Sequence, residues 1–268
     1  MDEKASLSAS ERADYEAFKQ RVRRKSGIDL SLYKEQQMHR RLRAMVERAG
    51  AATFCDYFAL MDRDPSEWAH FLDRMTINVS ELFRNPEKWE ELRTVTLPAL
   101  LQRRRSLRVW SAGCSFGAEP YSLAMLLEDL APAGRHYLLA TDIDAQILER
   151  AREGVFTETD VVNVPPAYRR KWLLPHPKGL QVVPALRERV TFRRHNLLAD
   201  PFEKDFDLIV CRNVVIYFTE DAKQRLYERF RDALAPGGSV FVGGTERIFN
   251  AEGLGLEGRL PFFYTRVA

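Results

Sequence analysis

The first third of the chain has the hydrophobic spacing of short amphipathic helices. Within residues 8–25, Tyr15, Phe18 and Val22 recur at intervals of three or four, and Gly27 follows. This spacing places the three side chains on one helix face, and a glycine at that position is a common helix end. We therefore predict a helix that stops at Gly27.

Further helical patterns continue to about residue 82. Met38, Leu42 and Met45 share one face of a second predicted helix, for which Asp29 or Ser31 can serve as the N-cap. Two more apolar patterns follow, around residues 54–58 and 68–75, on either side of Pro65. Residues 1–82 are therefore expected to form an all-helical domain.

From about residue 86, apolar runs of strand length alternate with helical segments. The runs cover residues 107–113, 137–143, 189–196, 206–213, 239–246 and 261–267, with helical patterns at 119–130, 145–152 and 220–234. Such alternation predicts an α/β domain, residues 83–268, with a mostly parallel sheet and helices on both faces. Ligands of these sheets bind at the carboxyl ends of the strands. The proline-rich residues 161–190, with the alternating GLQVVPAL, predict a small antiparallel β insert.

Composition narrows the class of protein. The 268 residues are 45% hydrophobic, enough for a substantial core, yet no apolar run approaches the length of about 18 residues expected of a membrane span. The first thirty residues are polar and charged, unlike a secretory signal. Cys55, Cys114 and Cys211 are widely spaced, which argues against disulfides and structural zinc. We expect a cytoplasmic, reduced, globular protein.

Positive charge is concentrated in residues 19–48. This segment has ten basic and three acidic residues, a net charge of +7, which leaves −4 for the rest of a chain whose total is +3. The ten are Lys19, Arg21, Arg23, Arg24, Lys25, Lys34, Arg40, Arg41, Arg43 and Arg48. A field of this kind suits an anionic partner, although a solvated helix face is an equally good explanation.

A glycine turn follows the first predicted strand. In VWSAGCSFGAEPYS, Gly113 and Gly117 lie between a strand and a helix, where a backbone without Cβ atoms can turn sharply and approach a ligand. Neither the GxGxxG spacing of dinucleotide enzymes nor the GxxxxGK[ST] of phosphate loops is present, so NAD and ATP are unlikely ligands.

The end of the second predicted strand carries Asp142 and Asp144. A carboxylate at this place accepts hydrogen bonds from ribose hydroxyls, whereas a second one can cap the helix that begins at Ala145. The two features together favour an adenosine cofactor without a polyphosphate. S-adenosylmethionine fits that description, and no metal is required.

Five blocks of sequence carry a resemblance to a known family. They are TINVSELFR (76–84), WSAGCSFGAEPYSLAM (110–125), ATDID (140–144), HNLL (195–198) and CRNVVIYF (211–218), preceded by GIDLSLYK and RRLR. In this order they resemble the chemotaxis receptor methyltransferases, the CheR family. The resemblance implies a class I S-adenosylmethionine-dependent methyltransferase fold, Rossmann-like, with an N-terminal helical domain.

The resemblance also implies an activity and its residues. Members transfer a methyl group from S-adenosylmethionine to glutamate side chains of membrane chemoreceptors, leaving S-adenosylhomocysteine. The positions that match the family's cofactor-binding residues, together with the turn glycine, are Asn78, Ser80, Arg84, Gly113, Glu119, Asp142, Asn196, Leu197, Arg212 and Asn213. Tyr217 matches a residue near the transferred methyl, and Arg84, with Asn78 and Ser80, matches the segment that closes over the cofactor. Ser80 is commonly threonine in the family and Ala118 commonly acidic.

Methyl transfer to glutamate sets modest chemical demands. A glutamate carboxylate is ionised at neutral pH, so no general base is needed and positioning carries most of the rate enhancement. We expect the Tyr217 hydroxyl and Arg84 to position the substrate carboxylate. The basic helices, with Arg40, Arg41 and Arg43, are expected to attract acidic receptor helices.

The loop of the β insert bears on which partners the protein binds. The β insert resembles the subdomain with which some members hold a receptor's C-terminal tethering peptide, but its loop WLLPHPKG has one glycine where those members have several. We therefore predict no tethering peptide, and a monomer whose partner is the cytoplasmic domain of chemoreceptors.

Two alternatives remain open. An RNA methyltransferase of the same architecture is disfavoured because Tyr33 is the only aromatic residue among the basic ones of residues 19–48. A catalytically silent S-adenosylmethionine-binding regulator is disfavoured because Arg84, Asn213 and Tyr217 are retained. A dehydrogenase ranks lower still.

Overall fold

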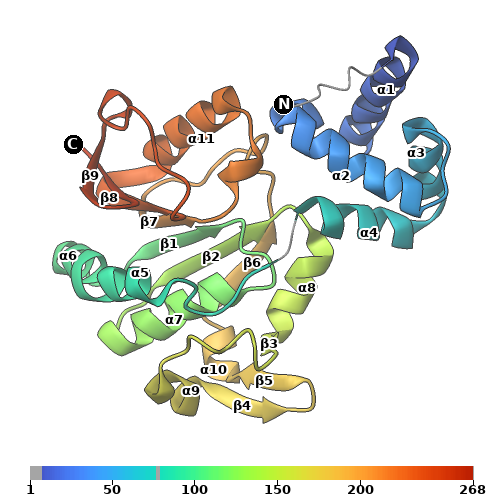
Figure 1. The fold of residues 1–268 in the computed structure, drawn as a ribbon. Helices are drawn as coiled ribbons and strands as arrows, with labels where there is room; N and C mark the ends of the chain where they lie inside the picture. Colours follow the sequence, from blue (N-terminus) through green and yellow to red (C-terminus); the bar gives the residue numbers. More distant parts are fainter. Residues whose placement is uncertain (1–7, 77–78, 268) are drawn as a thin grey trace. The chain divides into compact units, whose positions relative to one another are not determined.

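The computed structural model describes residues 8–76 and 79–267, which form two compact units (Figure 1). The first unit contains the N-terminal helices through Thr76 together with the later segment Tyr217–Ala222. The second unit contains the remaining residues and holds the sheets.

The first unit is helical and has an aromatic core. Its elements are α1 (Ala9–Ser26), the 3-10 turn η1 (Leu30–Leu32), α2 (Glu35–Arg48), α3 (Phe54–Arg63) and α4 (Pro65–Thr76). The fully buried Phe18 ring lies 5.7 Å from that of Phe54 and 6.2 Å from that of Phe71, centroid to centroid. Phe18 therefore ties α1 to α3 and α4.

The helix ends follow local capping rules, with one correction to the prediction. Gly27 (φ 77°) ends α1, and its N–H donates to the Arg23 carbonyl. Asp29 was predicted as a possible N-cap of α2. It instead caps η1, where its side chain accepts from the Ser31 N–H at 3.0 Å. The predicted N-cap of α2 was wrong because a 3-10 turn intervenes, and α2 begins after Lys34 without a side-chain cap.

The segment Tyr217–Ala222 joins the first unit through backbone hydrogen bonds. The Lys34 N–H donates to the Tyr217 carbonyl, and the Thr219 N–H donates to the Leu32 carbonyl, both at 2.9 Å. Tyr33 and Phe218 form an antiparallel bridge with their rings 5.1 Å apart, edge to face. Residues far apart in the chain thus complete the helical unit.

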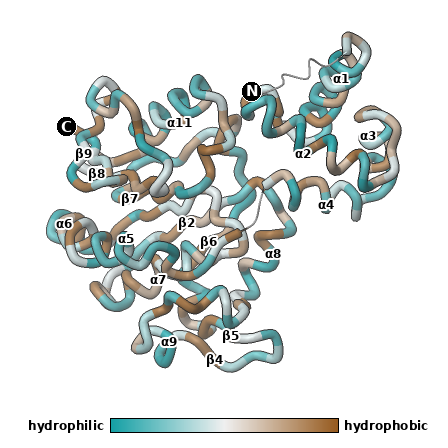
Figure 2. Tube along the Cα trace, in the orientation of Figure 1, coloured by the Kyte–Doolittle hydropathy of each residue, from teal (hydrophilic) through white to brown (hydrophobic). Residues whose placement is uncertain are grey.

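The second unit is built on a seven-stranded sheet with the order β6-β2-β1-β7-β8-β10-β9. The strands are β1 (Arg108–Ala112), β2 (Tyr137–Asp142), β6 (Val190–Arg194), β7 (Phe206–Cys211), β8 (Leu234–Val242), β9 (Leu256–Leu260) and β10 (Phe263–Arg266). Only the β8–β10 and β10–β9 pairs are antiparallel. The mostly parallel sheet is confirmed, although β9 was not predicted. Apolar residues dominate its central strands (Figure 2).

Helices cover both faces of this sheet. On one face lie α5 (Pro86–Glu91), the π-helix η2 (Leu92–Thr96), α6 (Leu97–Arg103), α7 (Ala118–Leu130) and α8 (Ala145–Glu153), whose apolar residues share one core with Val109. On the other face Trp110 packs against Phe206 and against Phe230 of α11 (Glu220–Ala233). Val109 and Trp110, neighbours in β1, thus point to opposite faces of the sheet and pack into two separate cores, as the alternation of side chains along a strand requires.

A second, three-stranded antiparallel sheet has the order β3-β5-β4. It includes β3 (Val155–Phe156), β4 (Leu173–His176) and β5 (Gly179–Val182), with α9 (Pro166–Trp172) and α10 (Pro184–Arg187) beside it. Pro177 and Lys178 connect β4 to β5. The predicted small antiparallel sheet is confirmed.

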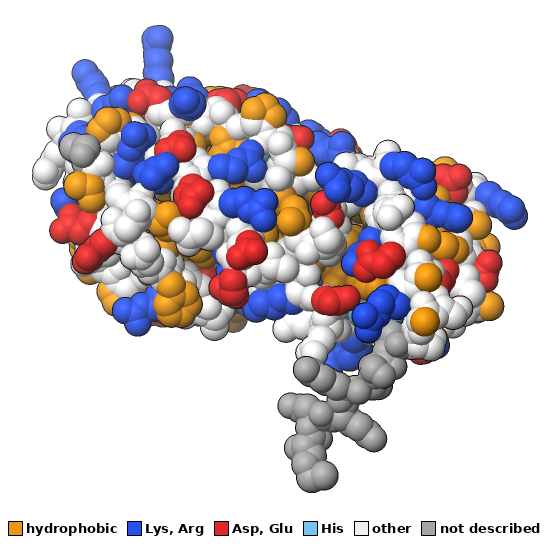
Figure 3. Space-filling view, turned by 90° about the horizontal axis from the view of Figure 1, so that it is seen from above, with side chains coloured by type: hydrophobic (Ala, Val, Ile, Leu, Met, Phe, Trp, Pro, Cys, Tyr) orange, Lys and Arg blue, Asp and Glu red, His pale blue; other side chains and the backbone are white. Residues whose placement is uncertain are grey.

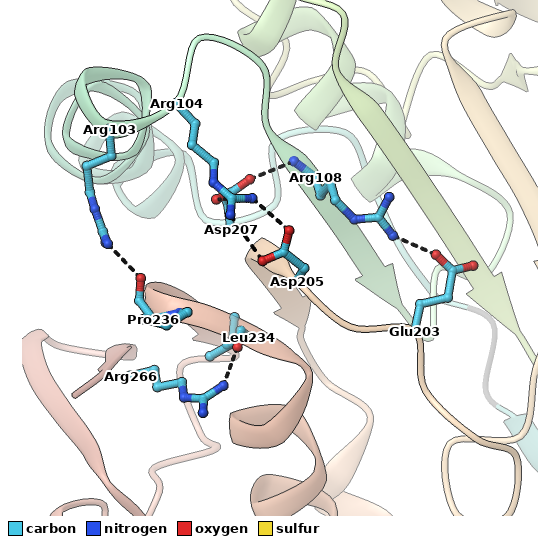
Figure 4. Close-up of polar contacts among 9 residues, drawn as sticks. All are labelled: Arg103, Arg104, Arg108, Glu203, Asp205, Asp207, Leu234, Pro236 and Arg266. Carbon is cyan, nitrogen blue, oxygen red and sulfur yellow. Dashed lines mark hydrogen bonds and ion pairs between the residues drawn. The ribbon is translucent and has the colours of Figure 1, made fainter. Parts of the chain in front are cut away.

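Arginines fasten the amino-terminal edge of the large sheet (Figure 4). Arg104, just after α6, donates to both carboxylate oxygens of Asp205 at 3.0 and 3.1 Å. Arg108 donates through its backbone N–H to Asp207 and through its side chain to Glu203, both at 2.8 Å. Arg103 donates to the Pro236 carbonyl, near the start of β8, at 2.6 Å. This edge is structural and lies opposite the carboxyl ends of the parallel strands.

Candidate functional site

The glycine turn after β1 is held by the neighbouring strand. Gly113 (φ 85°) and Cys114 both donate their N–H groups to the Thr141 carbonyl, at 2.8 and 2.9 Å. Gly117 (φ 91°) is the N-cap of α7. Gly113 must be glycine for a second reason, because a Cβ there would lie 2.5 Å from a methyl of Val214. The turn therefore brings the ends of β1, β2 and β7 together.

The structure separates the roles of Asp142 and Asp144. Asp144 is the N-cap of α8 and accepts from the Gln146 N–H at 2.9 Å. Asp142 accepts from the Ser115 N–H at 2.9 Å and from the Asp144 N–H at 3.1 Å, one on each oxygen. Burial raises the pKa of Asp142 to about 6, against the lowering effect of these N–H groups. An ionised carboxylate has about four acceptor sites, so hydrogen bonds from ribose hydroxyls remain possible.

Glu119 lies in the first turn of α7, beside the glycine turn. Its carboxylate accepts from the Ser111 hydroxyl at 2.7 Å. Burial raises its pKa to about 7, while the positive charge of Arg212 acts in the opposite direction. A cationic ligand at this place would favour the ionised carboxylate, which suits the predicted contact with the amino group of an amino-acid cofactor.

Arg212 is buried at the end of β7 and is committed to protein contacts. Its guanidinium donates to the Arg84 carbonyl and to the side-chain oxygen of Asn85, both at 2.9 Å, and lies 4.8 Å from the Phe241 ring centre. Burial lowers its pKa. Arg212 therefore fixes the backbone of Arg84, whose own side chain is partly exposed. Ser80 is also partly exposed, and Asn78 lies outside the described residues.

Asn196 and Leu197 form the loop after β6. The loop is tied to β2 because the His195 N–H donates to the Asp142 carbonyl at 2.8 Å. The Asn196 side chain accepts from the Leu198 N–H, and the Leu197 carbonyl accepts from Arg229 at 2.6 Å. The loop thereby has a fixed shape next to the predicted ribose carboxylate.

Sequence reasoning missed Glu246, which follows β8. Its buried carboxylate accepts N–H groups from Asn213 and Val215, in the turn after β7. The signal that could have found it is the acidic residue in GGTE, directly after a predicted strand. Contacts in the second unit thus join the predicted residues Gly113, Glu119, Asp142, Arg212 and Asn213 at the carboxyl edge of the sheet.

The remaining predicted residues belong to the first unit. Arg40 is exposed, whereas Arg43 pairs with Glu11 at 2.8 Å and Glu47 at 3.3 Å. Arg41 is partly buried and donates to the Met75 carbonyl at 2.9 Å.

The net charge of residues 19–48 overstates the field at this surface. Three of the ten basic side chains pair with acids outside that segment: Lys19 with Glu16, Lys25 with Asp62, and Arg43 with Glu11. Basic and acidic side chains are interspersed on the face in Figure 3.

The two buried cysteines offer no nucleophile. Cys114 and Cys211 are fully enclosed, and burial raises the pKa of each thiol well above its ordinary value. A thiol with a raised pKa is a poor nucleophile at neutral pH. Within residues 8–76 and 79–267, no three His, Cys, Asp or Glu side chains are arranged to hold a metal ion, and no helix is long and apolar enough to cross a membrane.

The site's donors and acceptors fit S-adenosylmethionine. The Gly113 turn gives backbone access, Asp142 can accept from ribose hydroxyls, and Glu119 can neutralise an amino group. A mostly parallel sheet with this constellation at its carboxyl edge defines an S-adenosylmethionine-dependent methyltransferase.

Comparison with known proteins gives the family. Residues 78–255 match the model of the CheR methyltransferase SAM-binding domain, and residues 13–76 match that of the CheR methyltransferase all-alpha domain. The chain belongs to the CheR methyltransferase family.

Relatives align over most of their length and of this chain. A "Chemotaxis protein methyltransferase" of Listeria innocua is 42% identical over 255 residues, covering 94% of this chain and 97% of that protein. Another of Escherichia coli is 34% identical over 265 residues, covering 94% and 89%. A "Chemotaxis protein methyltransferase 2" of Pseudomonas aeruginosa is 34% identical over 251 residues, covering 91% and 89%. Both the helical and the sheet-containing parts are therefore shared.

Proposed function

We propose that this protein methylates glutamate side chains in the cytoplasmic domain of membrane chemoreceptors, giving glutamate methyl esters during chemotactic adaptation. The observation that carries the proposal is the match of nearly the whole chain, helical part included, to relatives named chemotaxis protein methyltransferases. We assign receptor recognition to residues 1–82 and cofactor binding to residues 83–268, with the β insert at about 161–190.

The cofactor is held by groups at the carboxyl edge of the sheet. Asp142 accepts from the ribose hydroxyls, Glu119 faces the amino group, and the loop of Asn196 and Leu197 borders the adenine. Asn78, Ser80, Gly113, Arg212 and Asn213 complete this set. Bound S-adenosylmethionine supplies an electrophilic methyl group on a sulfonium. The chain's residues have to orient an already ionised carboxylate toward it and exclude competing water, and no proton has to be moved.

Arg84 and Tyr217 orient the substrate in this proposal. Arg84 is partly exposed, with its backbone carbonyl held by Arg212 and its guanidinium donating to the Val79 carbonyl at 3.4 Å. Such a residue can steer a carboxylate without trapping it. The Tyr217 hydroxyl is a neutral donor, which can bind a carboxylate oxygen without forming an ion pair that lowers its nucleophilicity.

The partner is an acidic helical surface of the receptor, without a tethering peptide and without nucleic acid. Arg40, Arg41 and Arg43 form the proposed receptor-facing set, in which Arg40 and Arg43 are exposed and Arg41 is partly buried. We propose that a single chain suffices for the reaction.

A methanol-release assay tests the proposal. The purified full chain is incubated with radiolabelled S-adenosylmethionine and a chemoreceptor cytoplasmic fragment, and the fragment is then treated with base. We expect base-labile label that is recovered as volatile methanol, as a methyl ester requires. A fragment with its methylated glutamates replaced by alanine is the matched control and should stay unlabelled. Base-stable label, label only in added RNA, or cofactor binding without transfer would each reject the proposal.

A further inference from the structure

The carboxylate of Glu246 is surrounded by backbone N–H groups from two loops. One oxygen accepts from Asn213 at 2.6 Å and from Gly243 at 2.8 Å, and the other accepts from Val215 at 2.9 Å. Glu246 is only 3% exposed. A carboxylate this deeply buried is tolerated because it is hydrogen-bonded on both oxygens. Glu246 therefore joins the end of β8 to the turn after β7.

The turn after β7 depends on this anion for its shape. Asn213 has φ 60°, in the left-handed region that residues other than glycine adopt infrequently. With Asn213 in this conformation, the N–H groups of Asn213 and Val215 both reach the Glu246 carboxylate, one on each oxygen, as in an anion-binding nest. Without the carboxylate, the buried Val215 N–H and the part-buried Asn213 N–H would lose their acceptor, and the turn would lose its restraint.

The turn after β7 also packs against the glycine turn after β1. Val214 lies between the two N–H donors, and its methyl group would be 2.5 Å from a Cβ built on Gly113. Arg212, which precedes the turn, holds the Arg84 carbonyl and the Asn85 side chain. A shift of the turn would therefore reach both the Gly113 backbone and the Arg84 backbone.

We propose that Glu246 is a positioning residue of the cofactor site, which holds the turn of residues 213–215 in the shape that S-adenosylmethionine binding requires. Glu246 acts through Asn213 and Val214 and does not itself touch the cofactor. The inference rests on the assignment of Asn213 and Gly113 to the cofactor site, and it does not depend on which side chain receives the methyl group.

Two adjacent glycines provide a matched pair of variants. A Cβ on Gly243 would lie 2.4 Å from the Glu246 carboxylate and 3.0 Å from the Asn213 nitrogen, so Gly243→Ala must displace one of them. A Cβ on Gly244 meets nothing within 4 Å among the described residues, so Gly244→Ala leaves the carboxylate in place. The third variant, Glu246→Gln, keeps the shape of the side chain but removes its charge.

The experiment measures the affinity of the full-length variants for S-adenosylhomocysteine by calorimetry, well below the melting temperature of each. Glu246→Gln and Gly243→Ala should raise Kd about tenfold, the loss expected for one charge-assisted hydrogen bond. Gly244→Ala should stay within about twofold of wild type. If Glu246→Gln and Gly243→Ala are folded and bind with the wild-type Kd, Glu246 is only structural and the proposal is overturned.

Hydrogen exchange on the wild-type chain keeps the test decisive if those two variants do not fold. The amides of Asn213 and Val215 should be protected without ligand, and further protected when S-adenosylhomocysteine is added. Rapid exchange of both amides with and without ligand would overturn the proposal. If the chain binds S-adenosylhomocysteine but leaves receptor glutamates unmethylated, the proposed function is rejected. The affinities of the variants for S-adenosylhomocysteine would still test the role of Glu246.

Discussion

The guanidinium carbon of Arg41 lies 5.3 Å from the centre of the Tyr217 ring. Tyr217 returns to the helical unit from a position 176 residues later in the chain, and Arg41 is anchored beside it by its bond to the Met75 carbonyl. A cation over the face of a tyrosine restrains the ring. Arg41 therefore has a partner inside the protein, whereas its neighbour Arg40 is exposed.

This difference predicts separate kinetic effects for two adjacent arginines. Arg41→Ala should lower kcat for receptor methylation about fivefold, equivalent to about 1 kcal/mol for a lost cation–π contact. Arg40→Ala should raise the apparent KM for receptor and leave kcat nearly unchanged, because it removes only a steering charge, and this effect should fade at high salt. Steady-state kinetics at two ionic strengths separates the two. If Arg41→Ala raised KM as much as Arg40→Ala does and left kcat unchanged, Arg41 would act only as a surface charge.

Replacing Tyr217 by phenylalanine tests its hydroxyl. The ring and its contact with Arg41 remain, so folding and cofactor binding should be preserved. Turnover should fall about tenfold or more, the effect of losing one hydrogen bond to a charged group. Single-turnover methylation and calorimetry with S-adenosylhomocysteine measure the two quantities. A loss of affinity as large as the loss of turnover would place Tyr217 in cofactor binding instead.

Cofactor affinity should weaken as the pH falls. Burial raises the pKa of Glu119 to about 7 and that of Asp142 to about 6 in the protein without ligand. Because both carboxylates are proposed to bind the cofactor in their ionised form, binding should release protons, and Kd for S-adenosylhomocysteine should rise when protons must first be removed. Kd should be nearly constant above about pH 8 and rise by up to about tenfold per pH unit for each protonated group below its pKa.

Glu119→Gln is the control for that pH dependence. This variant should bind more weakly at pH 8 and show no change in Kd between pH 8 and 7, with the remaining dependence near pH 6 due to Asp142. Calorimetry in buffers of different ionisation enthalpy counts the released protons directly. An affinity that is flat from pH 8 to pH 5.5 in the wild-type chain would contradict both assignments.

The two aspartates after β2 should differ in what their loss affects. Asp144→Ala removes the N-cap of α8 and should lower the free energy of unfolding by about 1 kcal/mol, with cofactor affinity nearly unchanged. Asp142→Asn should instead raise Kd for S-adenosylhomocysteine by about tenfold, because a neutral amide is a weaker acceptor for hydroxyls. Urea unfolding and calorimetry on both variants provide the comparison. If Asp144→Ala weakened cofactor binding and Asp142→Asn lowered only the stability, Asp144 would be the ribose ligand and Asp142 the structural residue.

A receptor's C-terminal peptide should bind weakly if at all. The connection between β4 and β5 is only Pro177 and Lys178, a short turn that contains no glycine. We expect no saturation up to about 1 mM peptide, the affinity of a non-specific contact. Fluorescence anisotropy with a labelled peptide measures this, and a micromolar Kd would overturn the prediction.

The sequence predicted well those features that depend on neighbours in the chain. The alternation of apolar residues found the central strands, and the Gly27 helix end was correct because both are local. The strand β9 was missed because LEGRL contains one glycine and two charges, and antiparallel pairing with β10 stabilises it. Arg43 was treated as a free cation because its partner Glu11 lies 32 positions earlier. Glu246 was missed for the same reason, since the Asn213 and Val215 N–H groups that it accepts come from another strand end.

The discontinuity of the helical unit limits how the protein can be dissected. A fragment that stops before residue 78 would lack Phe218, and the Tyr33 ring it covers would face water, as would the carbonyl of Leu32 and the N–H of Lys34. Exposed aromatic surface of this kind favours aggregation. Isolating a receptor-recognition module for binding studies therefore requires grafting residues 217–222 onto the fragment, or keeping the chain whole.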